Sequence, residues 1–220
     1  MKLPARSLAS HFWYESLRVI VICFWVIGFR IRYSGRENIP PSGGVLVISN
    51  HQSQFDPPLV GAGSPRRMNY LARETLFRFA PFRWLIRSLD AIPIDREGLG
   101  LSGIKESLRR LKRGEMVLLF PEGTRTRDGK VAAFRPGFVA LAVRSRSAIL
   151  PVAIEGAFQA WPRWQPLPSP GDIRVHYGPP ILPEQLVGMD ETGLVQEVES
   201  RVRRLHAELV GRPTPGRASG

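Results

Sequence analysis

The chain has 220 residues, enough for one domain with a hydrophobic core and short for two. Its 31 Lys and Arg residues outnumber its 19 Asp and Glu residues, and the formal net charge of +12 points to a polyanionic partner, either an anionic bilayer or nucleic acid. The single cysteine, Cys23, excludes a disulfide framework and a thiolate metal cluster.

Residues 19–29 form an uninterrupted run of eleven apolar or small residues with arginines close to both ends. A helix needs roughly 20 apolar residues to cross a bilayer, so this run is too short to span one. No small-residue cleavage site follows it, which argues against a signal peptide. We therefore expect residues 1–30 to be a membrane-associated helical segment in the interface, with Trp13, Tyr14 and Trp25 near the headgroups. A buried helix of a soluble core is the alternative.

The rest of the chain alternates between apolar segments of strand length and segments with helical spacing. Strands are predicted at residues 31–33, 45–49, 68–72, 91–94, 116–120, 148–154 and 173–177. Helices are predicted at residues 73–89, 101–111, 137–146 and 194–209. This alternation predicts an α/β fold: one domain, residues 31–210, with a mostly parallel mixed sheet flanked by helices. Residues 211–220 are expected to be a disordered tail.

Pro151 lies inside the apolar segment 148–154. Proline has no N–H to donate to a β-ladder, so it favours edge strands and bulges. We therefore predict that this segment lies at an edge of the sheet or contains a bulge.

An imidazole and a carboxylate are five residues apart just after the predicted strand 45–49. The sequence of residues 50–56 is Asn-His-Gln-Ser-Gln-Phe-Asp, and His51 should lie at the carboxyl end of the strand, where α/β sheets place their sites. If the loop folds back, Asp56 can hold one nitrogen of His51 while the other takes a proton from an alcohol. Two alternatives stay open: Asp56 before a Pro-Pro pair is also a good helix N-cap, and a single histidine is often a filler of core or surface.

A second polar cluster, Glu122-Gly123-Thr124-Arg125, follows the predicted strand 116–120 and is called the Glu-Gly-Thr-Arg turn below. Arginine suits bidentate contact with phosphate, although glycine in a tight turn is an ordinary structural feature. Arg96 follows another short strand, 91–94. Polar groups thus follow three predicted strands, counting His51, and together they indicate chemistry on a phosphorylated alcohol.

Six arginines are interleaved with four aromatic residues between positions 66 and 87, where Glu74 is the only acid. They are Arg66, Arg67, Arg73, Arg78, Arg83 and Arg87, with Phe77, Phe79, Phe82 and Trp84. The pattern favours a bilayer-facing surface, because aromatic rings can enter the headgroup layer while arginines pair with lipid phosphate. A solvated helix face and a site for single-stranded nucleic acid are the alternatives.

These motifs resemble those of the glycerolipid acyltransferases of the 1-acylglycerol-3-phosphate acyltransferase type. The resemblance extends from about residue 35 to residue 178. The family's blocks occur in the expected order: H-x4-D at His51 and Asp56, a second block at residues 91–96, F-P-E-G-T-R at residues 120–125, and a proline-containing block at residues 149–154. The first and third blocks are the specific ones. Family members often carry lysine where Arg73 stands here.

The resemblance implies an enzyme that moves a fatty acyl group from acyl-CoA or acyl carrier protein to the free hydroxyl of a lysophospholipid, most often 1-acylglycerol 3-phosphate, giving phosphatidic acid. His51, oriented by Asp56, would deprotonate the hydroxyl for direct attack on the thioester. The resemblance also implies an acyl channel that includes Pro151 and a phosphate site made of Arg96, Glu122, Gly123, Thr124 and Arg125. It implies attachment to the cytoplasmic face of the inner membrane, whose anionic surface is an expected partner, and no nucleic acid.

Direct transfer agrees with the residues available. Cys23 lies in the apolar N-terminal run, and no G-x-S-x-G nucleophile elbow occurs, so no enzyme nucleophile is evident. The four histidines lack H-E-x-x-H spacing and there is no cysteine pair, so a metal site is not favoured. We expect no metal or tightly held cofactor. The alternatives are an acyltransferase for another lysolipid or for glycerol 3-phosphate, and a non-catalytic protein that binds anionic lipid or nucleic acid.

Overall fold

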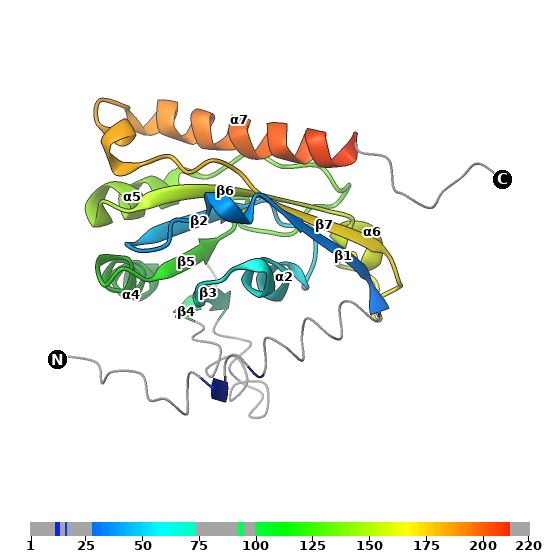
Figure 1. Ribbon diagram of the computed structural model, residues 1–220. Coiled ribbons are helices and arrows are strands. Elements are labelled where there is room, and N and C mark those ends of the chain that lie inside the picture. Colours follow the sequence, from blue (N-terminus) through cyan, green and yellow to red (C-terminus); the bar gives the residue numbers. More distant parts are fainter. Residues whose placement is uncertain (1–11, 14–15, 17–27, 74–91, 95–99, 212–220) are drawn as a thin grey trace.

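A computed structural model describes residues 12–13, 16, 28–73, 92–94 and 100–211 (Figure 1). Within this part of the chain, seven strands form one sheet in the order β1-β7-β6-β2-β5-β3-β4. Their bounds are β1 Arg30–Ser34, β2 Val45–Ser49, β3 Met68–Arg73, β4 Ile92–Ile94, β5 Met116–Leu119, β6 Ala148–Glu155 and β7 Asp172–Tyr177. All paired strands are parallel except β6 and β7, which are antiparallel. The predicted α/β domain with a mostly parallel mixed sheet is confirmed.

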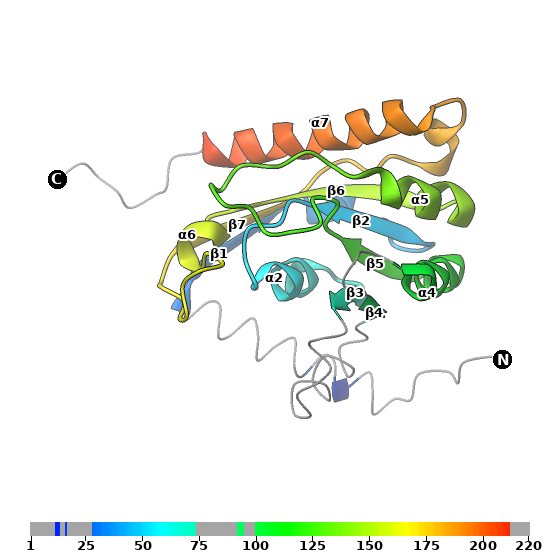
Figure 2. The same ribbon diagram turned by 180° about the vertical axis from the view of Figure 1, so that it is seen from behind.

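Helices cover both faces of this sheet, as Figures 1 and 2 show for α7 and α2 on opposite sides. The helical elements are η1 Arg36–Asn38, α2 Asp56–Gly63, α4 Gly100–Lys112, η3 Pro136–Phe138, α5 Val139–Ser145, α6 Ala157–Ala160, η4 Pro183–Leu186 and α7 Glu191–Val210. One buried cluster joins α4, α5 and α7 to the sheet, and a second joins α2 and α6 to its other face. The sheet is therefore the middle of three layers.

The two central strands β2 and β5 show why continuous apolar runs predicted buried strands. All residues of β2 and β5 are buried. Val45 and Val47 point into the cluster with α2, whereas Leu46 and Ile48 point into the cluster with α5 and α7. A strand covered on both faces needs apolar residues at every position, so its sequence does not alternate.

Of the two alternatives predicted for the segment with Pro151, the edge strand is wrong. Its strand, β6, is interior and pairs with β2 on one side and β7 on the other. The ladder with β7 begins only at Val152, and the Pro151 carbonyl accepts a hydrogen bond from the Gly178 N–H at 2.8 Å just beyond β7. Antiparallel pairing resumes beyond this point at Ile149, which exchanges backbone hydrogen bonds with Ile181 at 2.9 and 2.8 Å. Pro151 therefore lies in a short interruption of the pairing, where residues 150–151 face residues 178–180, and its missing N–H is tolerated there.

The basic cluster between positions 66 and 87 is described only in part, because residues 74–91 lie outside the described residues. Arg66 does not project from a bilayer-facing surface. Its guanidinium donates to the carbonyls of Pro40, Gly43 and Gly114, each at 2.7 Å. Burial lowers the pKa of Arg66. This arginine joins three turns at the amino-terminal edge of the sheet, which is a structural role.

Several other predictions fall on residues that lie outside the described ones. They concern the tail 212–220, the position of Arg96, the helix predicted at 73–89 apart from Arg73, and most of the segment 1–30. Among the described residues, no helix has the length and apolar character needed to cross a bilayer.

Candidate active site

The two motifs singled out in the sequence meet at the carboxyl edge of the sheet. His51 follows β2 and Glu122 follows β5, and these strands are parallel neighbours. The backbone N–H of His51 donates to Glu122 Oε1 at 2.8 Å, and the backbone N–H of Thr126 donates to the His51 carbonyl at 2.8 Å. Parallel pairing puts both strand ends at one edge, and these bonds join the two loops beyond it. The two motifs therefore form one site.

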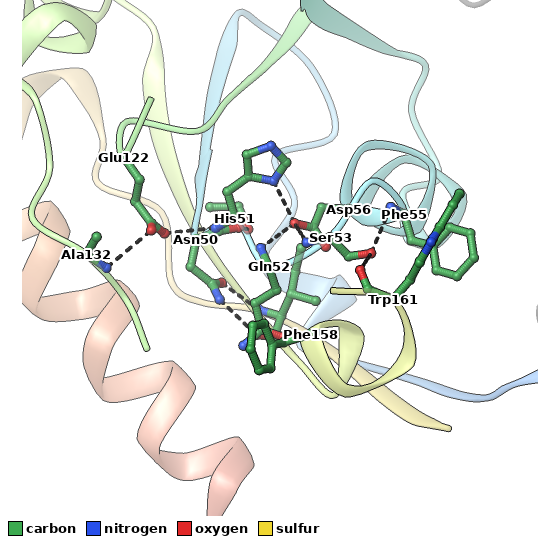
Figure 3. Close-up of polar contacts among 12 residues, drawn as sticks. Asn50, His51, Gln52, Ser53, Phe55, Asp56, Glu122, Ala132, Phe158 and Trp161 are labelled. Atoms are coloured by element: carbon green, nitrogen blue, oxygen red, sulfur yellow. Dashed lines mark hydrogen bonds and ion pairs between the residues drawn. The ribbon is translucent and has the colours of Figure 1, made fainter. Parts of the chain in front are cut away.

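His51 and Asp56 form a hydrogen-bonded pair, with 2.7 Å between Nδ1 and Oδ2. The Asp56 side chain is fully buried, whereas 20% of the His51 side chain is exposed. The same oxygen of Asp56 accepts the backbone N–H groups of Gln52 at 2.6 Å and Ser53 at 2.8 Å. Figure 3 shows the other ring nitrogen of His51 pointing away from this cluster. A carboxylate acceptor places the proton on Nδ1 and leaves Nε2 able to take a proton from a hydroxyl.

The N-cap interpretation of Asp56 is wrong. Helix α2 begins at Asp56, its N-cap residue is Phe55, and no side chain caps it. The Asp56 carboxylate instead turns back onto the loop that precedes the helix. The end of α2 is held by tyrosine hydroxyls, since Tyr33 donates to the Leu59 carbonyl and Tyr177 to the Val60 carbonyl. These bonds satisfy carbonyls of the last turn and fix the helix that carries Asp56.

The ring of Phe120 stacks on the imidazole ring of His51. Its centroid lies 4.1 Å from that of His51 with an interplanar angle of 16°, a stacked pair. Stacking and the Asp56 hydrogen bond together restrict rotation of the imidazole. Phe120 directly precedes the Pro-Glu-Gly-Thr-Arg motif, so the same strand end supplies the stacking ring and the turn.

Glu122 is buried, and both of its carboxylate oxygens accept backbone N–H groups. Oε1 accepts from His51 at 2.8 Å and Oε2 accepts from Ala132 at 3.2 Å. Burial outweighs these hydrogen bonds and raises the pKa of Glu122 to about 7. The sequence assigned Glu122 to a phosphate site, but its two oxygens join the His51 loop to the loop that follows the turn.

The remainder of the Glu-Gly-Thr-Arg turn is open. Gly123 and Thr124 are exposed and Arg125 is half-buried. Gly123 has φ +73°, in the region that favours glycine, and a Cβ there would lie 3.1 Å from Cζ of Arg135. The Gly123 N–H donates to the Phe120 carbonyl at 3.1 Å and closes the turn. A second guanidinium, that of Arg135, lies beside the predicted phosphate contacts. Arg96 is outside the described residues, but β4, which precedes it, runs parallel to β3.

Pro151 lies on the other side of the sheet from α2. A Cβ built at Gly178 would approach both Pro151, at 3.3 Å from its Cγ, and the side chain of Leu205 on α7. Pro151 is thus buried between β6 and α7. Its part in an acyl channel stays a prediction.

Gln52, between the two members of the pair, connects the site to distant elements. Its side-chain amide donates to the Gly129 carbonyl at 3.0 Å and accepts from the Phe158 N–H at 3.3 Å. The same amide nitrogen lies 3.3 Å from Glu155 Oε2 and 3.2 Å from His206 Nε2. His206 and Glu155 are themselves paired at 2.7 Å. Burial raises the pKa of Glu155, but the hydrogen bond and charge of His206 outweigh it and hold this pKa below its ordinary value.

Sequence reasoning missed the residues that hold the loop in place. Asn50 exchanges two hydrogen bonds with the backbone of Ile154, at 2.9 and 2.8 Å, and so extends the β2–β6 pairing beyond the strand (Figure 3). Asn50 directly follows a buried strand, and this position in the sequence could have indicated its role. His206 and Glu155 carry no such signal, because they are far from Gln52 along the chain.

The chain is similar to known acyltransferases. The family model described as Acyltransferase matches residues 30–155. A 1-acyl-sn-glycerol-3-phosphate acyltransferase of Pseudomonas aeruginosa is 35% identical over 188 residues, covering 84% of this chain and 72% of that protein. The enzyme of the same name from Bacillus subtilis is 28% identical, covering 80% and 91%. The crystal structure of the 1-acyl-sn-glycerophosphate (LPA) acyltransferase PlsC from Thermotoga maritima matches with a TM-score of 0.84 at 28% identity, covering 96% of this chain and 86% of that one.

Proposed function

Because this chain belongs to the Acyltransferase family, we propose that it transfers a fatty acyl group from acyl-CoA or acyl carrier protein to 1-acylglycerol 3-phosphate. The product is phosphatidic acid. One observation carries the proposal: the His51–Asp56 pair is joined to the Glu-Gly-Thr-Arg turn by the hydrogen bond from the His51 N–H to Glu122. A base for an alcohol and a cationic turn for a phosphate are then neighbours, as a phosphorylated alcohol requires.

In the proposed reaction, His51 Nε2 takes the proton of the free hydroxyl as the hydroxyl oxygen attacks the thioester carbonyl. Asp56 stabilises the imidazolium that forms, through the Nδ1 hydrogen bond. The tetrahedral intermediate then collapses, the C–S bond breaks, and the imidazolium returns its proton to the departing thiolate. An ester and a thiol are produced without an acyl-enzyme, so no nucleophilic side chain is needed.

We assign headgroup binding to the open part of the turn, namely Gly123, Thr124 and Arg125, together with Arg96. Guanidinium groups bind phosphate oxygens in a bidentate manner, and backbone N–H groups in a tight turn add further donors. Glu122 contributes to this site by holding the turn against the His51 loop, since its oxygens are already occupied by backbone amides. A carboxylate facing the phosphate directly would repel it.

The remaining assignments rest on the chemistry of the two substrates. We place Pro151 in the acyl-binding region, on the strength of its apolar position between β6 and α7. We place the enzyme at the cytoplasmic face of the membrane, where the thioester donors and the lipid acceptor are both accessible. The net charge of +12 supports attraction to an anionic lipid surface.

The test is an assay of the full chain with a labelled acyl-CoA and a panel of acceptors. We expect acylation of 1-acylglycerol 3-phosphate by the wild type and almost none by His51→Ala. His176→Ala is a matched control, because His176 is hydrogen-bonded to Ser34 in β1, away from the site, and should retain activity. Equal product from wild type and His51→Ala would remove His51 from the mechanism. Preference for another lysolipid or glycerol 3-phosphate would reassign the acceptor, and no product with any acceptor or donor would favour the non-catalytic binder.

A further inference from the structure

The loop at residues 161–171, which follows α6, exposes large apolar side chains. Trp164 is 62% exposed and Leu167 is 72% exposed. Trp164 packs edge-on against Phe158 of α6, with 5.4 Å between ring centroids. Figures 1 and 2 show α6 and the connection from it to β7 at one end of the molecule. We call residues 161–171 the Trp164 loop.

The Trp164 loop is attached directly to the loop that carries the candidate catalytic pair. Ser53 Oγ donates to the Trp161 carbonyl at 2.9 Å, and the rings of Phe55 and Trp161 lie 4.6 Å apart. Both Ser53 and Phe55 lie between His51 and Asp56 in the sequence. Whatever surface the Trp164 loop contacts is therefore next to the loop that holds His51.

The far end of the Trp164 loop meets the start of the folded domain. The Arg30 N–H donates to the Gly171 carbonyl at 3.1 Å, and the ring of Phe29 lies 5.4 Å from that of Phe55. The apolar run predicted to contact the membrane, residues 19–29, ends at Phe29. An aromatic series of Phe29, Phe55 and Trp161 thus connects the end of that run, the catalytic loop and the Trp164 loop.

Basic side chains outnumber acidic ones in the loops beside these apolar side chains. From Gly156 to Gly171 the sequence has no acidic residue and one basic residue, Arg163, which is exposed. Gly129 brings a second loop alongside, because a Cβ there would lie 3.3 Å from the ring of Phe158. That loop carries exposed Arg127 and Lys130 and one exposed acid, Asp128, whose carboxylate accepts hydrogen bonds from the Thr126 hydroxyl and the Lys130 N–H. Exposed Trp and Leu side chains beside arginine and lysine suit the headgroup layer of an anionic bilayer.

We propose that the Trp164 loop is a membrane-docking element that inserts Trp164 and Leu167 among the headgroups of an anionic bilayer. The element brings the His51 loop to the lipid surface, where an acceptor can pass to the base without crossing water. The inference rests on the proposed function, in which the acceptor is a lipid. It adds a second contact, inside the folded domain, to the N-terminal segment predicted from sequence.

The experiment places an environment-sensitive nitrobenzoxadiazole probe on Leu167→Cys, in a full-length chain that also carries Cys23→Ala. With vesicles of phosphatidylcholine and phosphatidylglycerol, we expect a blue shift and a severalfold gain in emission. The matched control is Val187→Cys in the same background. Val187 is 83% exposed, in the connection between η4 and α7, and Figure 1 shows the start of α7 far from α6. Because both chains keep the N-terminal segment, a difference between them reports on the loop alone.

No shift at position 167, or equal shifts at positions 167 and 187, would overturn the proposal. An equal shift with vesicles of phosphatidylcholine alone would overturn the part assigned to Arg127, Lys130 and Arg163. The double variant Trp164→Ser, Leu167→Ser gives a second readout: its activity should fall on vesicle-borne acceptor and stay near wild type on acceptor dispersed in detergent. Absence of wild-type activity in detergent would count against the proposed function, whereas the probe reports on docking without catalysis.

Discussion

Glu122 accepts a hydrogen bond from the backbone N–H of His51, with 2.8 Å between N and Oε1. The bond joins residues 71 positions apart and links the two motifs that the sequence presented separately. It gives Glu122 a part in holding the base in place, where the sequence had suggested direct contact with the phosphate. The predictions below follow from this arrangement.

Asp56→Asn should abolish most activity while leaving the protein folded. The asparagine oxygen would stay opposite the backbone N–H groups of Gln52 and Ser53 that Asp56 Oδ2 accepts, but the amide has no negative charge to stabilise the imidazolium that forms on His51. General-base catalysis contributes roughly 10²- to 10⁴-fold, so we expect kcat to fall by about that factor with little change in Tm. Asp190→Asn is the control, because Asp190 caps α7 through the Gly193 N–H and asparagine caps equally well. Activity of Asp56→Asn near that of Asp190→Asn would contradict the assigned role.

Glu122→Gln should change how stability depends on pH. The pKa of Glu122 is raised from 4.5 to about 7 in the folded protein. The folded state then binds the proton more tightly than the unfolded state. The contribution of Glu122 to the free energy of unfolding is therefore fully present below about pH 4.5 and is lost as pH rises through about 7. The variant lacks that titration. Measured by thermal unfolding, the Tm of the wild type minus that of the variant should decrease between about pH 5 and pH 8. A difference that stays constant over this range would show that Glu122 does not titrate there.

Arg125→Lys should weaken recognition of the phosphate more than it slows the chemistry. Lysine keeps the charge but cannot form the bidentate contact, and a hydrogen bond to a charged group is worth about 1.5–3 kcal/mol. We expect KM for 1-acylglycerol 3-phosphate to rise roughly 10- to 100-fold with kcat within a few-fold.

Two controls accompany this variant. Arg127→Lys, two residues along and exposed, should leave KM in detergent unchanged. A monoacylglycerol, which lacks the phosphate, should be used equally poorly by wild type and Arg125→Lys. If Arg125→Lys lowered activity equally on 1-acylglycerol 3-phosphate and on the monoacylglycerol, Arg125 would not be a phosphate contact.

Gln52→Ala should destabilise the fold and lower activity together. The substitution removes the hydrogen bonds to Gly129 and Phe158 and leaves half-buried backbone groups without these partners, at a cost of about 1–3 kcal/mol or less. We expect a lower urea midpoint and a lower kcat, because the loop between His51 and Asp56 loses its connection to β6 and α7. Gln159→Ala, at an exposed position of α6, should change neither. An unchanged urea midpoint in Gln52→Ala would show that this network does not hold the loop.

Much of the fold could be predicted because its signals are local. Apolar runs marked β2 and β5, and three- and four-residue spacing marked α4 and α7. The position of Pro151 could not be predicted in this way, because the rule against proline in central strands assumes a ladder on both sides at that residue. Here the antiparallel pairing is interrupted between Ile149 and Val152, and only the tertiary structure shows this.

By itself the sequence determined the order of strands and helices, the His51–Asp56 spacing and the composition of the Glu-Gly-Thr-Arg turn. It did so because side-chain periodicity and motif spacing are properties of neighbouring residues. The tertiary structure alone decided that both oxygens of Glu122 hold backbone amides, that Gln52 meets Glu155 and His206, and that the Trp164 loop lies against the catalytic loop. These contacts join residues far apart in the chain, and they form because the packing of the sheet and of α7 brings the His51 loop, the turn after β5 and the segments after β6 together at one edge.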